Sequence, residues 1–440
     1  MNGAIEKLCS LKVMVTLFVL FKLGAYYNKE VSIIIMLMSF SICVLLILKG
    51  KKEYMLGYFF SVLEFDSFLA LQNFSILLTS IMVIISFYTG HVRIKKSQVF
   101  FYILFCYWMG VCWLYYYDFS HDINYIDYSF TTLKHIGVCL NVMLIFSSGV
   151  KVRQLNQSIM ALFISSIIFI SLGVILNNPS LKMINMGVGY SAQLFFFVMY
   201  IASYLIFEKK TVLQSIFLFL AFIATIFLLK QTNTISTQNL VGVFALLIFL
   251  KMNKSVAIWI TGIAIAYFLG VFEQIKLQNL LYDLFSEELK IKIDNVFHSL
   301  ENVNNIMLVP HSVQVRIIEI ENITYQFNIF EFLFGRGVGG YFTDSHSVFP
   351  YLNEFDFSYE EIRAGVFFQP HNLGNLLLKL GTVFPIVTFL IVRNVPNQFK
   401  AMYASIYVFS MLNFGFTYYP SFLLGILLSG ITNNEETSDH

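Results

Sequence analysis

Three of the six arginines in this chain, Arg316, Arg336 and Arg363, fall within one short stretch of sequence. Arginine presents a rigid fork of N–H donors that can bind two oxygens of one phosphate at once. Solvation of a polar loop would explain the same three residues equally well. A role in binding phosphate therefore depends on the residues that surround them.

A glycine-rich turn surrounds the second arginine, in the stretch 334-FGRGVGGYF-342. Gly335 and Gly337 could let the backbone approach a phosphate closely, although a single motif of this kind more often forms an ordinary turn. Arg316 opens the amphipathic stretch that leads into this turn. The pattern predicts a short helix followed by a candidate anion-binding turn.

His371 follows Pro370 at the expected start of a helix. The N–H groups and partial positive charge of a helix N-terminus favour an anion, and they also favour the neutral imidazole that can accept a proton. Asn372 could orient the imidazole ring or a sugar. Taken alone, His371 is better explained as an interfacial residue at a helix cap. Asn375 and Lys379 follow at four-residue spacing, so the three could form one polar stripe.

The composition indicates which elements must position these residues. The chain has 440 residues, of which 58% are hydrophobic and only 12% are charged, with a net charge of +2. Soluble proteins carry about 25% charged residues. Apolar runs of roughly 20 residues, long enough to cross a bilayer as helices, recur along the chain. We therefore expect an all-α polytopic membrane protein.

The expected spans amount to about 12 to 14 crossings, depending on whether two compact segments cross as hairpins. These hairpins are residues 54–89 and 401–432. The remaining spans are expected at 11–27, 31–48, 98–117, 131–149, 157–176, 187–207, 211–230, 234–250, 255–273 and 373–392.

Positive charge in the short loops predicts the orientation. With the N-terminus in the cytoplasm, fourteen Lys and Arg fall in cytoplasmic loops and three in external loops. The C-terminus is then cytoplasmic as well. Residues 274–372 become one large external loop with short helices, between a bundle over 1–273 and the last spans over 373–432, and 433–440 form a polar tail.

Ionisable residues within apolar segments are candidates for function, because their burial in lipid is costly. These residues are Lys22, Glu64, Asp66, Lys134 and Lys379. The five cysteines all lie in or beside apolar segments, so they suggest neither a disulfide framework nor a zinc site.

The order of the polar elements carries a resemblance to a known family. An arginine, a short amphipathic helix, the turn 333-LFGRGVGG-340 and the stretch 371-HNLGNLLLKLG-381 occur in that order before the last spans. This arrangement resembles the O-antigen polymerase and O-antigen ligase superfamily. The motif covers residues 316–381, and the layout of the spans extends the likeness over the chain.

The resemblance implies a glycosyltransferase of the inner membrane that needs no metal or other cofactor. Its substrate would be an oligosaccharide linked to undecaprenyl diphosphate, at the periplasmic face. The resemblance further implies that Arg316 holds the diphosphate, with Arg336 and Arg363 as weaker candidates, and that His371 is the base. A chain-length regulator protein is a partner compatible with this class, and nucleic acid is not.

Two features depart from the family pattern. A Ser-Arg pair often seen in a mid-chain span is missing, and the stretch 234-TISTQNLVG-242 occupies that region. The second departure is in an earlier loop. Family members commonly carry an arginine in an earlier external loop, and here the stretch 182-KMINMGVGYSAQ-193 has Lys182 in that place. Lysine can hold a phosphate as a point charge but lacks the two-pronged geometry.

Three functions remain open from the sequence. A polymerase that joins lipid-linked repeat units is the leading interpretation, because such chains are divergent and rich in aromatic residues. A ligase that transfers the glycan to lipid A-core shares the same arginine and histidine chemistry. A flippase or other transporter is a third interpretation, but we find no internal repeat, and transporters generally need no large external loop.

Overall fold

The computed structural model describes residues 2–27, 29–63, 71–90, 92–94, 96–116, 125–175, 311–349, 351–352, 356–393, 395–396, 399–400, 402–403, 406–407 and 418–430. Several sequence predictions lie outside these residues. They are Lys182, Glu64, Asp66, the spans predicted at 187–207, 211–230, 234–250 and 255–273, residues 274–310 of the loop, and the tail 433–440.

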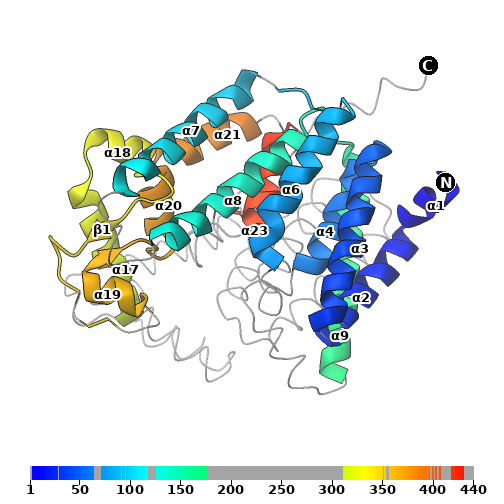
Figure 1. Ribbon diagram of the computed structural model, residues 1–440, viewed down its shortest axis with the longest axis horizontal. Coiled ribbons are helices and arrows are strands. Elements are labelled where there is room, and N and C mark those ends of the chain that lie inside the picture. The colour runs from blue at the N-terminus through cyan, green and yellow to red at the C-terminus, as the bar shows by residue number, and fades with distance from the viewer. Residues whose placement is uncertain are drawn as a thin grey trace, which may run out of the picture.

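The described part of the chain is predominantly helical, as the apolar runs predicted (Figure 1). In the N-terminal half, α2 (Leu11–Tyr27) packs against α3 (Lys29–Leu48) and α9 (Val152–Ile175), and α8 (Tyr125–Ile145) packs against α6 (Leu71–Tyr88). The other elements of this half are α1 (Asn2–Leu8), the short 3-10 helix η1 (Lys52–Tyr54), α4 (Met55–Leu63) and α7 (Lys96–Tyr116).

Helix lengths relate these elements to the predicted spans. Among the described residues, one segment is long and apolar enough to cross a membrane, Val152–Phe169 within α9, and half of it is buried. The pair α20 (Asn372–Leu380) and α21 (Val383–Val392) would be a second if both are counted as one bent span. Shorter apolar segments occupy Ile33–Leu48, Ile76–Tyr88, Gln98–Val111 and Thr132–Ile145.

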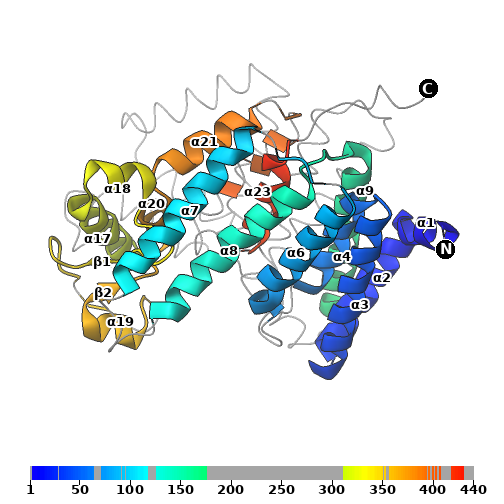
Figure 2. The same ribbon diagram turned by 45° about the horizontal axis from the view of Figure 1, so that its top comes forward.

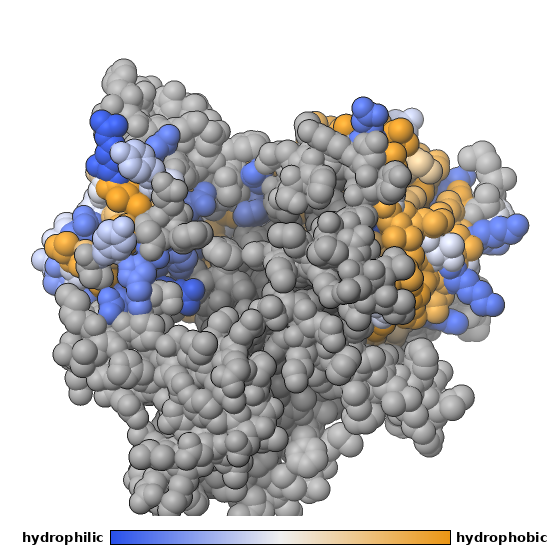
Figure 3. Space-filling view, turned by 90° about the horizontal axis from the view of Figure 1, so that it is seen from below, coloured by the Kyte–Doolittle hydropathy of each residue, from blue (hydrophilic) through white to orange (hydrophobic). Residues whose placement is uncertain are grey.

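Large apolar side chains lie on the outside of several of these helices. On α3, Ile34 is 58% exposed and Leu37 is 54% exposed, and on α7, Ile103 is 59% exposed. Figure 3 shows a broad hydrophobic area over the N-terminal helices, on the right, with hydrophilic residues at its outer edge, and a mixed, more hydrophilic group of residues on the left. Soluble monomers rarely expose contiguous apolar surface of this kind, so this surface needs an apolar environment or a partner.

The second half contributes a small polar unit beside this bundle (Figure 2). Its elements are α17 (His311–Gln326), α18 (Ile329–Phe334), β1 (Phe342–Thr343), α19 (Tyr359–Ala364) and β2 (Val366–Phe367). The strands β1 and β2 pair in antiparallel orientation, with Phe342 opposite Phe367. A separate aromatic core, distinct from that of the bundle, holds the unit together, and α20 adds Leu378 to it.

The amphipathic stretch that the sequence predicts from Arg316 differs from the structure at both ends. Helix α17 already begins at His311, so Arg316 lies within it. The helix then stops before Asn328, which caps a new helix, α18, through reciprocal hydrogen bonds with Glu331. Asn328 favours this break because its side chain accepts the backbone N–H that a helix start leaves unpaired.

The span predicted over residues 373–392 is not one straight helix in the structure. Helices α20 and α21 meet at an angle of 90°. Gly381 lies at the bend with a φ of 67°, a left-handed conformation that glycine adopts without strain. The predicted boundary between loop and span therefore falls inside one structural unit, since α20 packs against α17 and α18. Helix α23 (Tyr418–Leu428) lies against α8, within the predicted hairpin at 401–432.

Candidate functional site

The imidazole of His371 is paired with a buried carboxylate, that of Glu319 on α17. The His371 Nδ1 lies 2.5 Å from Glu319 Oε1, and the backbone N–H of His371 donates to Glu319 Oε2 at 3.0 Å. The Glu319 side chain is fully buried, whereas the His371 side chain is 14% exposed. Two elements far apart in the sequence are therefore joined at the start of α20, and we call this pair the Glu319–His371 dyad.

Local sequence explains how the two helices approach so closely. His371 is the N-cap residue of α20 and has an extended backbone, so its own N–H points out of the helix towards Glu319. Gly374 faces α17, where an added Cβ would lie 3.4 Å from Ile323 Cδ1 and 3.6 Å from Glu319 Oε2. The Phe357 ring packs edge-on against the imidazole, at 5.5 Å between centroids. The dyad thus has an apolar wall on one side.

The protonation state of Glu319 decides which nitrogen of His371 is available. Burial raises the pKa of the Glu319 carboxyl, while hydrogen bonds from His371 and the charges of His371 and Arg316 act against that rise. An ionised Glu319 accepts the Nδ1–H, which leaves the lone pair on Nε2. Within the described part of the chain, Nε2 has no hydrogen-bond partner. His371 is therefore arranged to accept a proton at Nε2.

Arg316 lies on the same helix as Glu319, one turn before it. Its side chain is exposed, and its positive charge acts on the Glu319 carboxylate. A cation beside a histidine–carboxylate pair is an arrangement that can bind an anionic leaving group next to a base. The structure therefore places Arg316, which the sequence singled out separately from His371, close enough to Glu319 for its charge to act on that carboxylate.

The glycine-rich turn has a role that differs from the predicted one. Gly335 and Gly337 have φ values of 73° and 76°, and a Cβ on Gly337 would lie 2.5 Å from the carbonyl oxygen of Trp108. The turn donates its N–H groups to carbonyl oxygens at the end of α20 and on α7: Arg336 N to Leu378 O, Gly337 N to Lys379 O and Val338 N to Trp108 O. Two of these N–H groups cap α20 and the third bonds to α7, so none of the three is directed at a phosphate.

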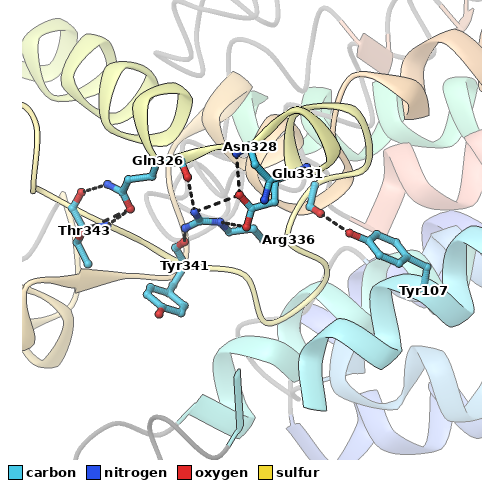
Figure 4. A network of polar contacts seen from close by, with 8 residues as sticks. Tyr107, Gln326, Asn328, Glu331, Arg336, Tyr341 and Thr343 are labelled. Carbon is cyan, nitrogen blue, oxygen red and sulfur yellow. Dashed lines mark hydrogen bonds and ion pairs between the residues drawn. The ribbon is translucent and has the colours of Figure 1, made fainter. Parts of the chain in front are cut away.

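Arg336 is held within its own loop (Figure 4). Its guanidinium forms an ion pair with Glu331, with Nε at 3.0 Å from Oε1, and it donates to the carbonyl oxygens of Gln326 at 2.9 Å and Tyr341 at 2.7 Å. It also lies over the Phe327 ring, at 5.2 Å from the centroid. Most of its five N–H donors are used in this way. This arrangement favours a structural role over the predicted contact with substrate.

The polar stripe predicted along α20 is divided in the structure. Lys379 is buried, and its Nζ donates to the carbonyl oxygens of Val338 at 3.2 Å and Gly340 at 2.5 Å. Lys379 therefore fastens the glycine-rich turn to the end of α20, whereas His371 takes part in the dyad at the start. Asn375, between them, is partly buried.

Arg363 and Asn372 are the remaining predicted residues that the structure describes. Arg363 lies in the last turn of α19 and is exposed, and Asn372 is the first residue of α20. Within the described residues, no group of three or more His, Cys, Asp or Glu side chains could hold a metal ion.

Glu319 is the member of the site that the sequence prediction missed. The sequence contained a pattern that could have indicated it, because Glu319 lies three residues after Arg316 among the apolar residues of an amphipathic stretch. A carboxylate in that position has to find a partner when the apolar face is buried.

The chain matches no known family model, no characterised protein and no solved structure. The assignment of function therefore depends on the geometry of the site and on the sequence pattern.

Proposed function

We propose that this chain is a polytopic inner-membrane glycosyltransferase that polymerises oligosaccharide repeat units carried on undecaprenyl diphosphate. The active site faces the periplasm, and the enzyme requires no metal. The observation that carries the proposal is the Glu319–His371 dyad with Arg316 one turn away on α17. Supporting it are the apolar composition, the charge distribution and the exposed apolar faces of α3 and α7.

In the proposed reaction, a sugar hydroxyl of one lipid-linked repeat unit attacks the anomeric carbon of the growing glycan. His371 Nε2 removes the hydroxyl proton as the new glycosidic C–O bond forms. The bond between the anomeric carbon and the diphosphate oxygen breaks, and undecaprenyl diphosphate leaves with the electron pair. Arg316 stabilises the negative charge on that leaving group. Residues Arg363 and Lys182 are further candidates for contacts to the diphosphate or the glycan.

Glu319 supports the base in two ways. It accepts the Nδ1–H, so the neutral imidazole keeps its lone pair on Nε2. It also stabilises the imidazolium that forms when Nε2 takes the proton, as a carboxylate does in catalytic triads. Because Glu319 is fully buried, this stabilisation is weakly screened by solvent.

Substitution of His371 in the source organism tests the role of the base. We expect His371→Gln to leave glycan with single repeat units, because loss of a positioned base lowers the rate about 10²–10⁴-fold. Glycan length on gels is the measurement. His346→Gln is the matched control, since His346 is an exposed histidine of the same unit and stacks on Tyr325.

Deletion of the gene separates the polymerase from the ligase, which would use the same site chemistry. A polymerase deletion leaves single repeat units attached to lipid A-core. Long glycan stranded on undecaprenyl diphosphate would instead identify the ligase. Unchanged glycan length in both His371→Gln and Arg316→Ala would exclude the proposed site.

A further inference from the structure

Helix α18 carries an apolar surface that no described part of the chain covers. Its sequence is IFEFLF, and none of its residues is buried. Ile329 is 76% exposed and Phe330 is 52% exposed, and Phe332 and Leu333 are exposed as well. In water such a helix would be unfavourable, since each large apolar side chain gains about 1.5–3 kcal/mol on full burial.

The exposed face of α18 continues onto the faces of two neighbouring helices. Phe330 packs against Tyr107 of α7, with ring centroids 5.5 Å apart, and Thr382, the N-cap of α21, donates to the carbonyl oxygen of Phe332 at 3.0 Å. On α7, Ile103 is 59% exposed, and on α21, Ile386 is 57% exposed. Under the proposed function, α7 and α21 are membrane helices, so their exposed faces contact lipid.

The depth of α18 in such a membrane can be measured along the two helices that it contacts, α7 and α21. At about 1.5 Å per residue, Trp108 lies about 18 Å along α7 from Lys96, the basic residue at its cytoplasmic end. Thr382 lies about 17 Å along α21 from Arg393, which marks the cytoplasmic end of that helix. Both values are close to the middle of a ~30 Å hydrocarbon core, and any tilt would make the heights smaller.

The depths measured at Trp108 and at Thr382 agree because α7 and α21 lie side by side. Phe384, near the start of α21, contacts both Phe101 and Trp108 on α7, each at 5.8 Å between ring centroids. Trp108 also donates from its indole Nε1 to the carbonyl oxygen of Phe334 at 2.8 Å. The end of α18 is therefore fixed at the height of Trp108.

Many carbonyl groups of the irregular backbone beside α18 are hydrogen-bonded within the protein. At membrane depth, backbone outside a helix is tolerated only where its polar groups are satisfied by the protein. Seven carbonyl oxygens of this segment accept hydrogen bonds from side chains: Gln326 and Tyr341 from Arg336, Phe332 from Thr382, Phe334 from Trp108, Gly335 from Tyr107, and Val338 and Gly340 from Lys379. Figure 4 shows part of this network.

The charged side chains of the segment are neutralised in the same way. Glu331 is the single charged residue of α18, and it pairs with Arg336 and closes the capping box with Asn328. An unpaired charge at this depth would be costly, whereas a paired and hydrogen-bonded charge is tolerated. Both charges are therefore compatible with an apolar environment.

We propose that residues 326–341 form a re-entrant element within the bilayer, in which the exposed face of α18 contacts lipid acyl chains. This inference rests on one part of the proposed function, namely that the chain is a membrane protein. The large external loop then does not lie wholly outside the membrane. Through the bonds between the glycine-rich turn and α20, the element also anchors the helix that carries His371.

Lipid contact at α18 can be tested by labelling single added cysteines with an environment-sensitive fluorophore in proteoliposomes. The test site is Ile329→Cys, and the matched control is Tyr359→Cys. Both are the first residue of a six-residue helix with a capping box, and both are well exposed, at 76% and 67%. Labelled protein without the added cysteine gives the background from the native cysteines.

We expect the Ile329→Cys label to be quenched by nitroxide groups near the ends of lipid acyl chains, as strongly as a reference label at Ile103→Cys on α7. The Tyr359→Cys label should be quenched by aqueous iodide instead. Quenching of the Ile329→Cys label by iodide, or shielding from both quenchers by another protein, would overturn the inference. If the Ile103→Cys reference itself meets water, the membrane part of the proposed function fails as well.

Discussion

Glu319 determines how His371 can act. A neutral histidine at a helix start has two tautomers, and an ionised Glu319 carboxylate would select the one with a hydrogen on Nδ1. The Glu319 carboxyl is desolvated, which raises its pKa, and its bonds to His371 and the charge of Arg316 partly offset this effect. The site therefore depends on one residue that must be both buried and ionised.

That desolvation has a consequence for stability at different pH values. Burial raises the pKa of the Glu319 carboxyl in the folded protein above its ordinary value, so the folded protein binds more protons than the unfolded chain in the window just above that value. Stability from this group is present below the unfolded pKa and is lost as pH rises through the folded pKa. We expect the wild type to gain stability relative to Glu319→Gln as pH falls from neutral towards that window.

Thermal unfolding in detergent at a series of pH values measures this difference. Glu321→Gln is the control, since Glu321 lies on the same helix but is exposed and shows no such burial. A wild-type advantage over Glu319→Gln that grows as pH rises would contradict the assigned direction.

The glycine-rich turn and the end of α20 are held together by hydrogen bonds in both directions, and we call this contact the joint. The turn caps the C-terminal carbonyl groups of α20, and Lys379 returns two hydrogen bonds to the turn. Gly337 is required both for its positive φ and for its contact with α7. This joint holds the start of α20, and hence His371, against α17.

Substitution of Gly337 should show how much the contact with α7 contributes. Gly90 is a matched control because it has a φ of 70° and nothing within 4 Å of an added Cβ, whereas Gly337 has a φ of 76° and meets the Trp108 carbonyl. Each alanine substitution carries the strain of a positive φ, of order 1 kcal/mol or more. We expect Gly337→Ala to lower the thermal unfolding temperature clearly more than Gly90→Ala does. Equal effects would show that the turn is not packed as described.

The sequence predicted the helical class, and it singled out Arg316 and His371 as candidate site residues, because apolar runs and helix caps are local signals. It did not predict that Glu319 would pair with His371, since that contact joins residues far apart in the sequence. The bend at Gly381 was missed for a similar reason. An isolated glycine in an apolar run does not reveal the turn that packs against it.

The roles of Arg336 and the glycines show a further limit of a motif. An arginine among glycines is compatible with phosphate binding and with an internal network, and only the acceptor positions distinguish the two. In the structure the acceptors are Glu331 and the carbonyl groups of Gln326 and Tyr341. The motif therefore predicted an important place in the chain but not the chemistry of each residue.

For the whole molecule, an apolar helical bundle carries a small polar unit with its own aromatic core. The dyad lies where the two meet, since α17 belongs to the unit and α20 leads into α21. This is a suitable location for an enzyme with an amphiphilic substrate, whose glycan is polar and whose carrier is a lipid. The proposed re-entrant element would extend the apolar region up to the same joint.

Reconstitution of the purified protein tests the proposed function most directly. Proteoliposomes would be supplied with an undecaprenyl-diphosphate-linked repeat unit from the source organism, in the presence of a metal chelator. We expect wild-type protein to produce longer lipid-linked glycan and to release undecaprenyl diphosphate, and His371→Gln and Glu319→Ala to lose this activity about 10²-fold or more while remaining folded. Absence of elongation by the wild type, or equal elongation by folded His371→Gln protein, would contradict the proposal.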